Sequence, residues 1–188
     1  MGIRATIAVF LVGLGTSAHA ADSVEALAST CNNCHGVNGV SVGPTMPSIG
    51  GLPQAYLTNV MLEWKSGTRF SATMGRLLKG YSDVQIADLA AYFAKQPWVP
   101  QAQKIDDARV RLGAQSLKRC EKCHGNDGLP RDGETPPVNG QWADYLYLES
   151  LKYRDDAVGM SNRQMRGAMK RLSDEELRAV SDYYAGQK

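Results

Sequence analysis

The sequence predicts an all-α protein built as two tandem domains of similar size. Apolar residues recur with helical spacing, and two segments begin with a capping box. Landmarks of the first half also return in the second half at an offset of 89 to 91 residues. No stretch of any length alternates apolar and polar residues as a β-strand would.

An amphipathic helix is predicted ahead of the first cysteine pair, because apolar residues recur there at i, i+3, i+4 and i+7. These residues are Val24, Leu27, Ala28 and Cys31. In the second half, Asp106 or Asp107 is suited to cap the corresponding helix before Cys120, since an aspartate side chain can accept from the free N–H groups of a first turn.

Each half is expected to end in a helix that starts with a capping box, Ser82-x-x-Gln85 in the first and Ser173-x-x-Glu176 in the second. In this motif the serine and the residue three positions later satisfy each other's free backbone N–H groups. An apolar stripe follows each box and marks the buried face. The stripe residues are Ile86, Leu89, Ala90 and Phe93 in the first helix and Leu177, Val180 and Tyr184 in the second.

The internal repeat indicates a duplication, with only small insertions between the copies. Matching positions are Cys31 with Cys120, 47–50 with 137–140, Tyr56 with Tyr145, Trp64 with Tyr153, Ser82 with Ser173, and Tyr92 with Tyr183. Two prolines, Pro97 and Pro100, mark a stiff connection between the copies. We therefore expect a signal peptide at residues 1–20, an N-terminal domain at 21–97 and a C-terminal domain at 98–188.

The first twenty residues resemble a secretory signal. Arg4 precedes an apolar run of 11 residues, from Ala5 to Gly15, and a small-residue cleavage site at Ala18-His19-Ala20 follows. The run is shorter than the roughly 17 residues that a membrane-spanning helix needs. Cleavage after Ala20 and a periplasmic protein without a membrane span are therefore predicted.

The charge balance excludes one class of function. The chain has 21 Lys and Arg against 19 Asp and Glu, whereas a nucleic-acid-binding protein needs a strongly basic face. We expect no nucleic-acid partner.

The four cysteines indicate the chemistry. They form the motifs Cys31-Asn32-Asn33-Cys34-His35 and Cys120-Glu121-Lys122-Cys123-His124, each of which is the C-x-x-C-H signature of haem c attachment. Two thiols one helical turn apart can add to the two vinyl groups of one porphyrin, and the adjoining histidine can then bind the iron. The sequence predicts two covalently attached haem c groups, bound through Cys31, Cys34, Cys120 and Cys123, with His35 and His124 as iron ligands.

Cysteine pairs of this kind have three other known uses. Two disulfides would suit an exported protein, a redox-active C-x-x-C is known in thioredoxin-like proteins, and four thiolates could hold zinc. The disulfide and thioredoxin-like readings do not explain a histidine directly after both pairs. The pairs are 89 residues apart, each in its own repeat, which disfavours a shared zinc site.

The second iron ligand follows by elimination. His19 leaves with the signal peptide, and no other histidine remains beyond the two in the motifs, so methionine is expected. Met74 and Met165 each lie eight residues before a capping serine, and no other methionines occupy equivalent places. The remaining four are expected to be core or surface residues: Met46, Met61, Met160 and Met169.

Thioether ligation raises the reduction potential, and a doubly ligated iron has no free position for oxygen or peroxide. The sequence thus predicts electron transfer, with no catalytic residue.

A binding histidine needs an acceptor for its other ring N–H. The carbonyls of Pro47 and Pro137 are candidates, and ordinary turn prolines are an equally good explanation. Trp64 and Tyr153 could reach haem propionates, although packing in the core is favoured for both.

With these residues placed, the chain resembles the class I cytochromes c, and most of all the two-domain dihaem cytochromes of the c-four type. Within that group it is similar to the cytochrome subunit of flavocytochrome c sulfide dehydrogenase, on the stretches 41–44, 74–82 and 92–98. The resemblance implies two tandem class I cytochrome c domains with one covalently bound haem each. It also implies an FAD-containing flavoprotein partner, with FAD on that partner only, and a soluble electron-acceptor protein.

Two alternatives remain open. The chain could be a free c-four type carrier that feeds a terminal oxidase, and such a shuttle should show charged rings around its haem edges. A dihaem peroxidase would need an open iron position and commonly a further histidine, which this sequence does not offer after cleavage.

Overall fold

The computed structural model describes residues 23–156 and 158–188. Over these ranges the chain forms helices and connecting loops without a strand, which confirms the predicted all-α class. No helix in the described ranges is long and apolar enough to cross a membrane. The predicted signal peptide at residues 1–20 lies outside the described residues.

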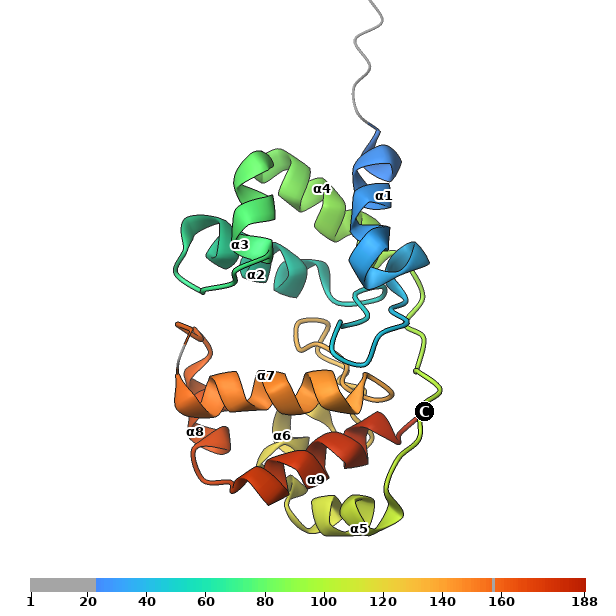
Figure 1. Cartoon of the computed structure of the whole chain (residues 1–188), viewed down its shortest axis with the longest axis vertical. Coiled ribbons are helices and arrows are strands. Elements are labelled where there is room, and N and C mark those ends of the chain that lie inside the picture. Colours follow the sequence, from blue (N-terminus) through green and yellow to red (C-terminus); the bar gives the residue numbers. More distant parts are fainter. Residues whose placement is uncertain (1–22, 157) are drawn as a thin grey trace, which may run out of the picture.

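The first half is arranged around one helix, α4, against which α1 and α2 both pack (Figure 1). Its helices are α1 Val24–His35, α2 Gln54–Ser66, α3 Met74–Leu77 and α4 Asp83–Ala94, with 3₁₀ turns at Val37–Gly39 and Leu78–Gly80. The predicted stripe of α4 is buried throughout. The core cluster of the first half consists of Ala28, Leu52, Leu57, Leu89, Ala90 and Phe93.

The second half repeats this plan, because α5 and α7 pack against α9. Its helices are α5 Asp107–Gln115, α6 Glu121–His124, α7 Ala143–Asp155, α8 Arg163–Met169 and α9 Asp174–Ala185, with a 3₁₀ turn at Leu117–Arg119. Figure 1 shows the two helical groups stacked along the long axis of the molecule. The core cluster of the second half is smaller than that of the first and consists of Leu117, Cys120, Val180 and Tyr184.

The predicted helix starts are confirmed by their hydrogen bonds. Both capping boxes are complete at Ser82 and Ser173, and Asp106 caps α5 by accepting from the N–H groups of Ala108 and Arg109. Each such cap satisfies backbone donors that a helix start leaves free.

The helix before the second cysteine pair is shorter than its counterpart. Whereas α1 runs through Cys31 to His35, α5 ends at Gln115 and the chain makes a 3₁₀ turn before Cys120. Gly113 lies where α5 crosses α9, and a Cβ there would sit 2.2 Å from the carbonyl oxygen of Ala179. A glycine so close to the helix end allows this crossing and weakens the last turn.

The connection between the halves is extended and packs on the second half. The indole Nε1–H of Trp98 donates to the carbonyl of Asn139 at 3.0 Å, and the N–H of Gln101 donates to the carbonyl of Gly140 at 2.7 Å. The proline-rich segment predicted as a linker is therefore held at several points.

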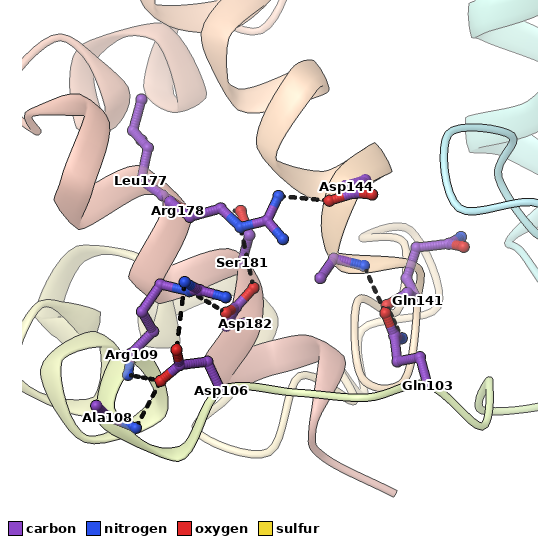
Figure 2. Close-up of polar contacts among 11 residues, drawn as sticks. Gln103, Asp106, Ala108, Arg109, Gln141, Asp144, Leu177, Arg178, Ser181 and Asp182 are labelled. Carbon is purple, nitrogen blue, oxygen red and sulfur yellow. Dashed lines mark hydrogen bonds and ion pairs between the residues drawn. The ribbon is translucent and has the colours of Figure 1, made fainter.

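A network of charged side chains joins α5, α7 and α9 (Figure 2). At its centre is the carboxylate of Asp182, which is only 1% exposed. It pairs with Arg109 of α5 and with Arg178 one turn earlier on α9. Arg178 also bonds to Asp144 near the start of α7. One buried carboxylate thus ties together the three helices that form this half.

The first half has alanine at the equivalent positions of its own helices. Counting from the matching helix starts, Asp182 corresponds to Ala91, Arg178 to Ala87 and Asp144 to Ala55. The two copies of the repeat are consequently stabilised in different ways at the same helix contacts.

We expect Asp182→Ala to lower the free energy of unfolding by about 1–3 kcal/mol, because it removes a buried carboxylate that accepts charged hydrogen bonds. Urea unfolding followed by circular dichroism measures this change. The exposed Arg131, which faces Asp127 on the surface, provides the control, and Arg131→Ala should leave the midpoint unchanged. An equal effect of both variants would contradict a special role for the buried network.

Candidate haem-binding sites

The first cysteine pair lies on the last turns of α1. Cys31 is half-buried, Cys34 is exposed and His35 is buried. Burial raises the pKa of the Cys31 thiol. The two thiols are three residues apart on one helix, so they lie about one turn from each other.

The second pair has the same arrangement on a shorter helix. Cys120 precedes α6 and is buried, Cys123 is exposed and His124 ends the helix and is buried. Burial raises the pKa of the Cys120 thiol to about 11. In both halves the first thiol and the histidine point into the fold, while the second thiol faces outward.

The geometry counts against two of the alternative uses of these cysteines. All four are free thiols, so neither pair forms a disulfide. Within the described residues, no three His, Cys, Asp or Glu side chains gather closely enough to hold a metal ion. The two cysteine pairs lie in different halves of the structure.

Each histidine is held by a proline carbonyl. The Nδ1 atom of His35 lies 2.9 Å from the carbonyl oxygen of Pro47, and that of His124 lies 3.1 Å from the carbonyl oxygen of Pro136. Burial lowers the pKa of both imidazoles, which favours the neutral ring. Since a carbonyl only accepts, Nδ1 carries the proton and Nε2 keeps a lone pair for a metal.

The acceptor in the second half differs from the predicted one. Pro136, and not Pro137, accepts from His124. The sequence alignment of 47–50 with 137–140 was wrong by one residue, because matching backbone bonds put Gly51 opposite Gly140: their N–H groups donate to Phe93 and Tyr184, respectively. Both histidines therefore have their acceptor 12 residues later.

The two predicted methionine ligands occupy equivalent places. The backbone N–H of Met74, at the start of α3, bonds to Ser71 Oγ at 3.1 Å, and that of Met165, in α8, bonds to Asn162 Oδ1 at 3.0 Å. In each case the acceptor is three residues earlier, and each methionine is half-buried.

The other described methionines pack in the protein as expected. Met160 and Met169 are buried, and Met61 packs against the first core cluster. Met46 is half-buried in the loop before Pro47.

These donor sets suit haem c. Each half offers two free thiols one turn apart, a buried neutral imidazole with Nδ1 already bonded, and a thioether from a separate segment. Covalent attachment uses the thiols, and low-spin iron takes imidazole nitrogen and thioether sulfur as ligands.

A buried arginine lies between the halves, and sequence reasoning missed it. Arg69 follows α2, is only 3% exposed and forms an ion pair with Glu149 of α7. Its guanidinium also lies 5.0 Å from the ring centre of Trp64 and 6.0 Å from that of Tyr153. Trp64 and Tyr153, which occupy matching positions of the repeat, thus both contact the guanidinium of Arg69.

Several tyrosines share this buried region. Burial raises the pKa of Tyr56 and Tyr145, and likewise that of Tyr153. Burial alone would lower the pKa of Arg69, but Glu149 and the neighbouring tyrosines raise it above its ordinary value. The three tyrosines therefore stay neutral and Arg69 stays positively charged at neutral pH. Arg69 and Glu149 are 80 residues apart, and no local pattern marks either as a partner of the other.

Comparison with known proteins gives matches over most of the chain. The family model for cytochrome c matches residues 110–186. Cytochrome c4 of Azotobacter vinelandii is 31% identical over 198 residues, covering 94% of this chain and 93% of that protein. The crystal structure of reduced recombinant cytochrome c4 from Pseudomonas stutzeri superposes with a TM-score of 0.78 at 27% identity, covering 89% of this chain and 98% of that one.

A further match is shorter. The cytochrome subunit of sulfide dehydrogenase from Chlorobaculum tepidum is 39% identical over 69 residues, which is 37% of this chain and 62% of that protein. The c-four type resemblance is thus confirmed over most of the chain, whereas the resemblance to the sulfide dehydrogenase subunit is confined to about a third of it.

We expect Glu149→Gln to lower the free energy of unfolding by about 2–3 kcal/mol, because buried Arg69 loses its nearest counter-charge. The loss is partial since Glu63 lies 4.0 Å from the same guanidinium. Lys152, an exposed neighbour that also pairs with Glu149, offers the matched control, and Lys152→Ala should change the value by less than about 0.5 kcal/mol. Comparable unfolding curves for both variants would rule out the buried pair as a stabilising contact.

Proposed function

Because this chain belongs to the family of dihaem cytochromes c4, we propose that it carries electrons through two haem c groups, one in each half. The observation that supports this most directly is the repeated site: two free thiols beside a buried histidine whose Nδ1 is bonded to a proline carbonyl.

The residues of each half have separate tasks in this proposal. Cys31 and Cys34 attach the first haem, and His35 binds its iron together with Met74. The equivalent set in the second half attaches and binds the second haem: Cys120, Cys123, His124 and Met165. The proline carbonyls keep each imidazole in the tautomer that offers Nε2 to iron.

Haem c supplies a one-electron iron couple when bound, and the chain adjusts it. Thioether ligation favours the ferrous state and raises the reduction potential. With His35 and Met74 binding one iron and His124 and Met165 the other, neither iron would have room for a small substrate, and the protein would transfer electrons without a catalytic residue of its own.

Export to the periplasm is part of the proposal. The apolar run and the Ala18-His19-Ala20 site support a cleaved signal peptide.

The electron donor proposed here is an FAD-containing flavoprotein of the sulfide dehydrogenase type, with a soluble protein as acceptor. The match to a sulfide dehydrogenase cytochrome subunit supports it. So do two exposed valines that follow the first cysteine pair in the chain, Val37 and Val42, which are 70% and 89% exposed, since a subunit that stays bound buries apolar surface.

A free carrier that feeds a terminal oxidase is the second candidate. The matches over most of the chain are to cytochromes c4, and these favour it. The exposed Lys118, Arg119 and Lys122 around the second cysteine pair would suit transient, salt-sensitive encounters with an acidic partner.

We expect Met74→Ala and Met165→Ala each to open one iron position, so that the ferrous variants bind one carbon monoxide per chain while the parent binds none. A titration followed by visible absorbance measures this. Met46→Ala is the control and should behave as the parent. Carbon monoxide binding by the parent, or by the control alone, would reject the two methionines as iron ligands.

Gentle purification from the periplasmic fraction, with haem and flavin absorbance followed together, tests the donor. We expect a flavoprotein to co-elute in a fixed ratio and anaerobic sulfide to reduce the haems of the complex. If the dihaem chain elutes alone and sulfide reduces it no faster than in buffer controls, the free carrier is the correct function.

A further inference from the structure

A single glutamine side chain of the second half is bonded to both backbone groups of one residue in the first half. Gln141 is 3% exposed. Its Oε1 accepts from the N–H of Ser48 at 3.0 Å, and its Nε2 donates to the carbonyl of Ser48 at 2.9 Å. The two residues are 93 positions apart in the chain, so the contact exists only when the halves are together.

The bonded peptide group is the one that holds the first histidine. The N–H of Ser48 and the carbonyl of Pro47 belong to the same peptide unit, and that carbonyl is the acceptor for His35 Nδ1. One chain of hydrogen bonds therefore runs from the Gln141 amide, through the 47–48 peptide, to the imidazole of His35. A peptide whose N–H is bonded has a more negative carbonyl oxygen, since hydrogen bonds in series polarise one another.

Gln141 is itself held firmly. Figure 2 shows Gln103, from the segment between the halves, reaching the loop that carries it. Gln103 Nε2 donates to the carbonyl of Gln141 at 2.9 Å, and Gln103 Oε1 accepts from the N–H of Ala143 at the same distance. Nearby, the indole of Trp142 donates to the carbonyl of Ser41. The side chain of Gln141 is therefore presented to Ser48 from a fixed backbone.

The second half lacks this arrangement at its own histidine. The acceptor for His124 is Pro136, and the next residue is Pro137, which has no N–H to donate. The position that matches Gln141 in the first half is Leu52, a buried member of the first core cluster. The two copies of the repeat thus share the proline carbonyl but differ in the next residue: the N–H of Ser48 is bonded to Gln141, whereas Pro137 has no N–H.

We propose that Gln141 is a positioning residue for the first haem site, which acts through the 47–48 peptide to strengthen the hydrogen bond of His35 and so lowers the reduction potential of the first haem relative to the second. The proposal rests on the proposed ligation of iron by His35. A stronger acceptor at Nδ1 makes the imidazole a more basic ligand, and a more basic ligand favours the ferric state. The second half would thereby adjust the chemistry of the first without touching its ligands.

The test uses the full haem-loaded protein and the variant Gln141→Leu, which places the residue of the matching position at this site. A redox titration followed by NMR, in which the two haems give separate signals, reads both potentials. We expect the potential of the first haem to rise and that of the second to stay unchanged. In the ferrous protein the Nδ1–H resonance of His35 should move upfield, as a weakened hydrogen bond requires, while that of His124 stays in place.

Ser48→Ala is the matched control. It removes the hydroxyl that accepts from the N–H of Ser41 and loosens the same loop, but leaves the 47–48 peptide bonded to Gln141. It should leave both potentials unchanged. If Gln141→Leu does not take up two haems, Gln141→Asn, whose shorter amide cannot reach both groups of Ser48, should give the same shift.

Three results would overturn the inference: an unchanged first potential and His35 resonance in the loaded variants, an equal shift of both potentials, or an equal shift caused by Ser48→Ala. The proposed function fails separately, since it requires the parent protein to hold two low-spin haems, which its haem content and absorbance spectrum report before any variant is made.

Discussion

An imidazole that offers one nitrogen to a metal must have the other nitrogen bonded, and much of each half is organised to satisfy this need. The acceptor is a proline carbonyl 12 residues after the histidine.

The loop that carries this proline is fixed on both sides. Ile49 and Gly50 donate to the carbonyl of Gly39, and their counterparts Val138 and Asn139 donate to that of Gly128. The next residue in each half, Gly51 or Gly140, donates to the end of α4 or α9, respectively. The glycines matter here, because a Cβ at Gly39 would sit 2.5 Å from the nitrogen of Gly50. The terminal helices, the loops and the histidines therefore form one connected frame in each half.

Much of this frame could be predicted from sequence, because its signals are local. Capping boxes at Ser82 and Ser173, the stripe of α4 and the two C-x-x-C-H motifs each occupy one short segment, and the structure contains the predicted helices. The repeat also identified Met74 and Met165 as an equivalent pair. It failed at Pro136 and Pro137, where two adjacent prolines let the alignment slip by one residue. Only the backbone bonds of the folded chain distinguish the two prolines, since they fix which carbonyl faces the ring of His124.

The contacts between the halves could not be predicted at all. Arg69 with Glu149, and Gln141 with Ser48, join residues 80 and 93 positions apart, and neither pair belongs to a periodic pattern. A polar residue such as Gln141 would ordinarily be expected at the surface, but its side chain is buried where it bonds to Ser48 of the other half. Asp182 is also a polar residue in a buried position, but its partners Arg109 and Arg178 belong to the same half, and its counterpart in the first half is Ala91. Sequence patterns describe what the copies have in common, and the features that distinguish them emerge from packing.

The interface also bears on how the duplicated chain can be divided. Cutting it at the proline-rich connection would expose Arg69 without its carboxylate and would leave both backbone groups of Ser48 without their amide partner. Each half has its own helices and cysteine pair, but each also has buried polar groups whose partners lie in the other half. A single copy of the repeat would therefore need a different surface at this place, with polar or small residues where Arg69 and Ser48 now find partners in the other half.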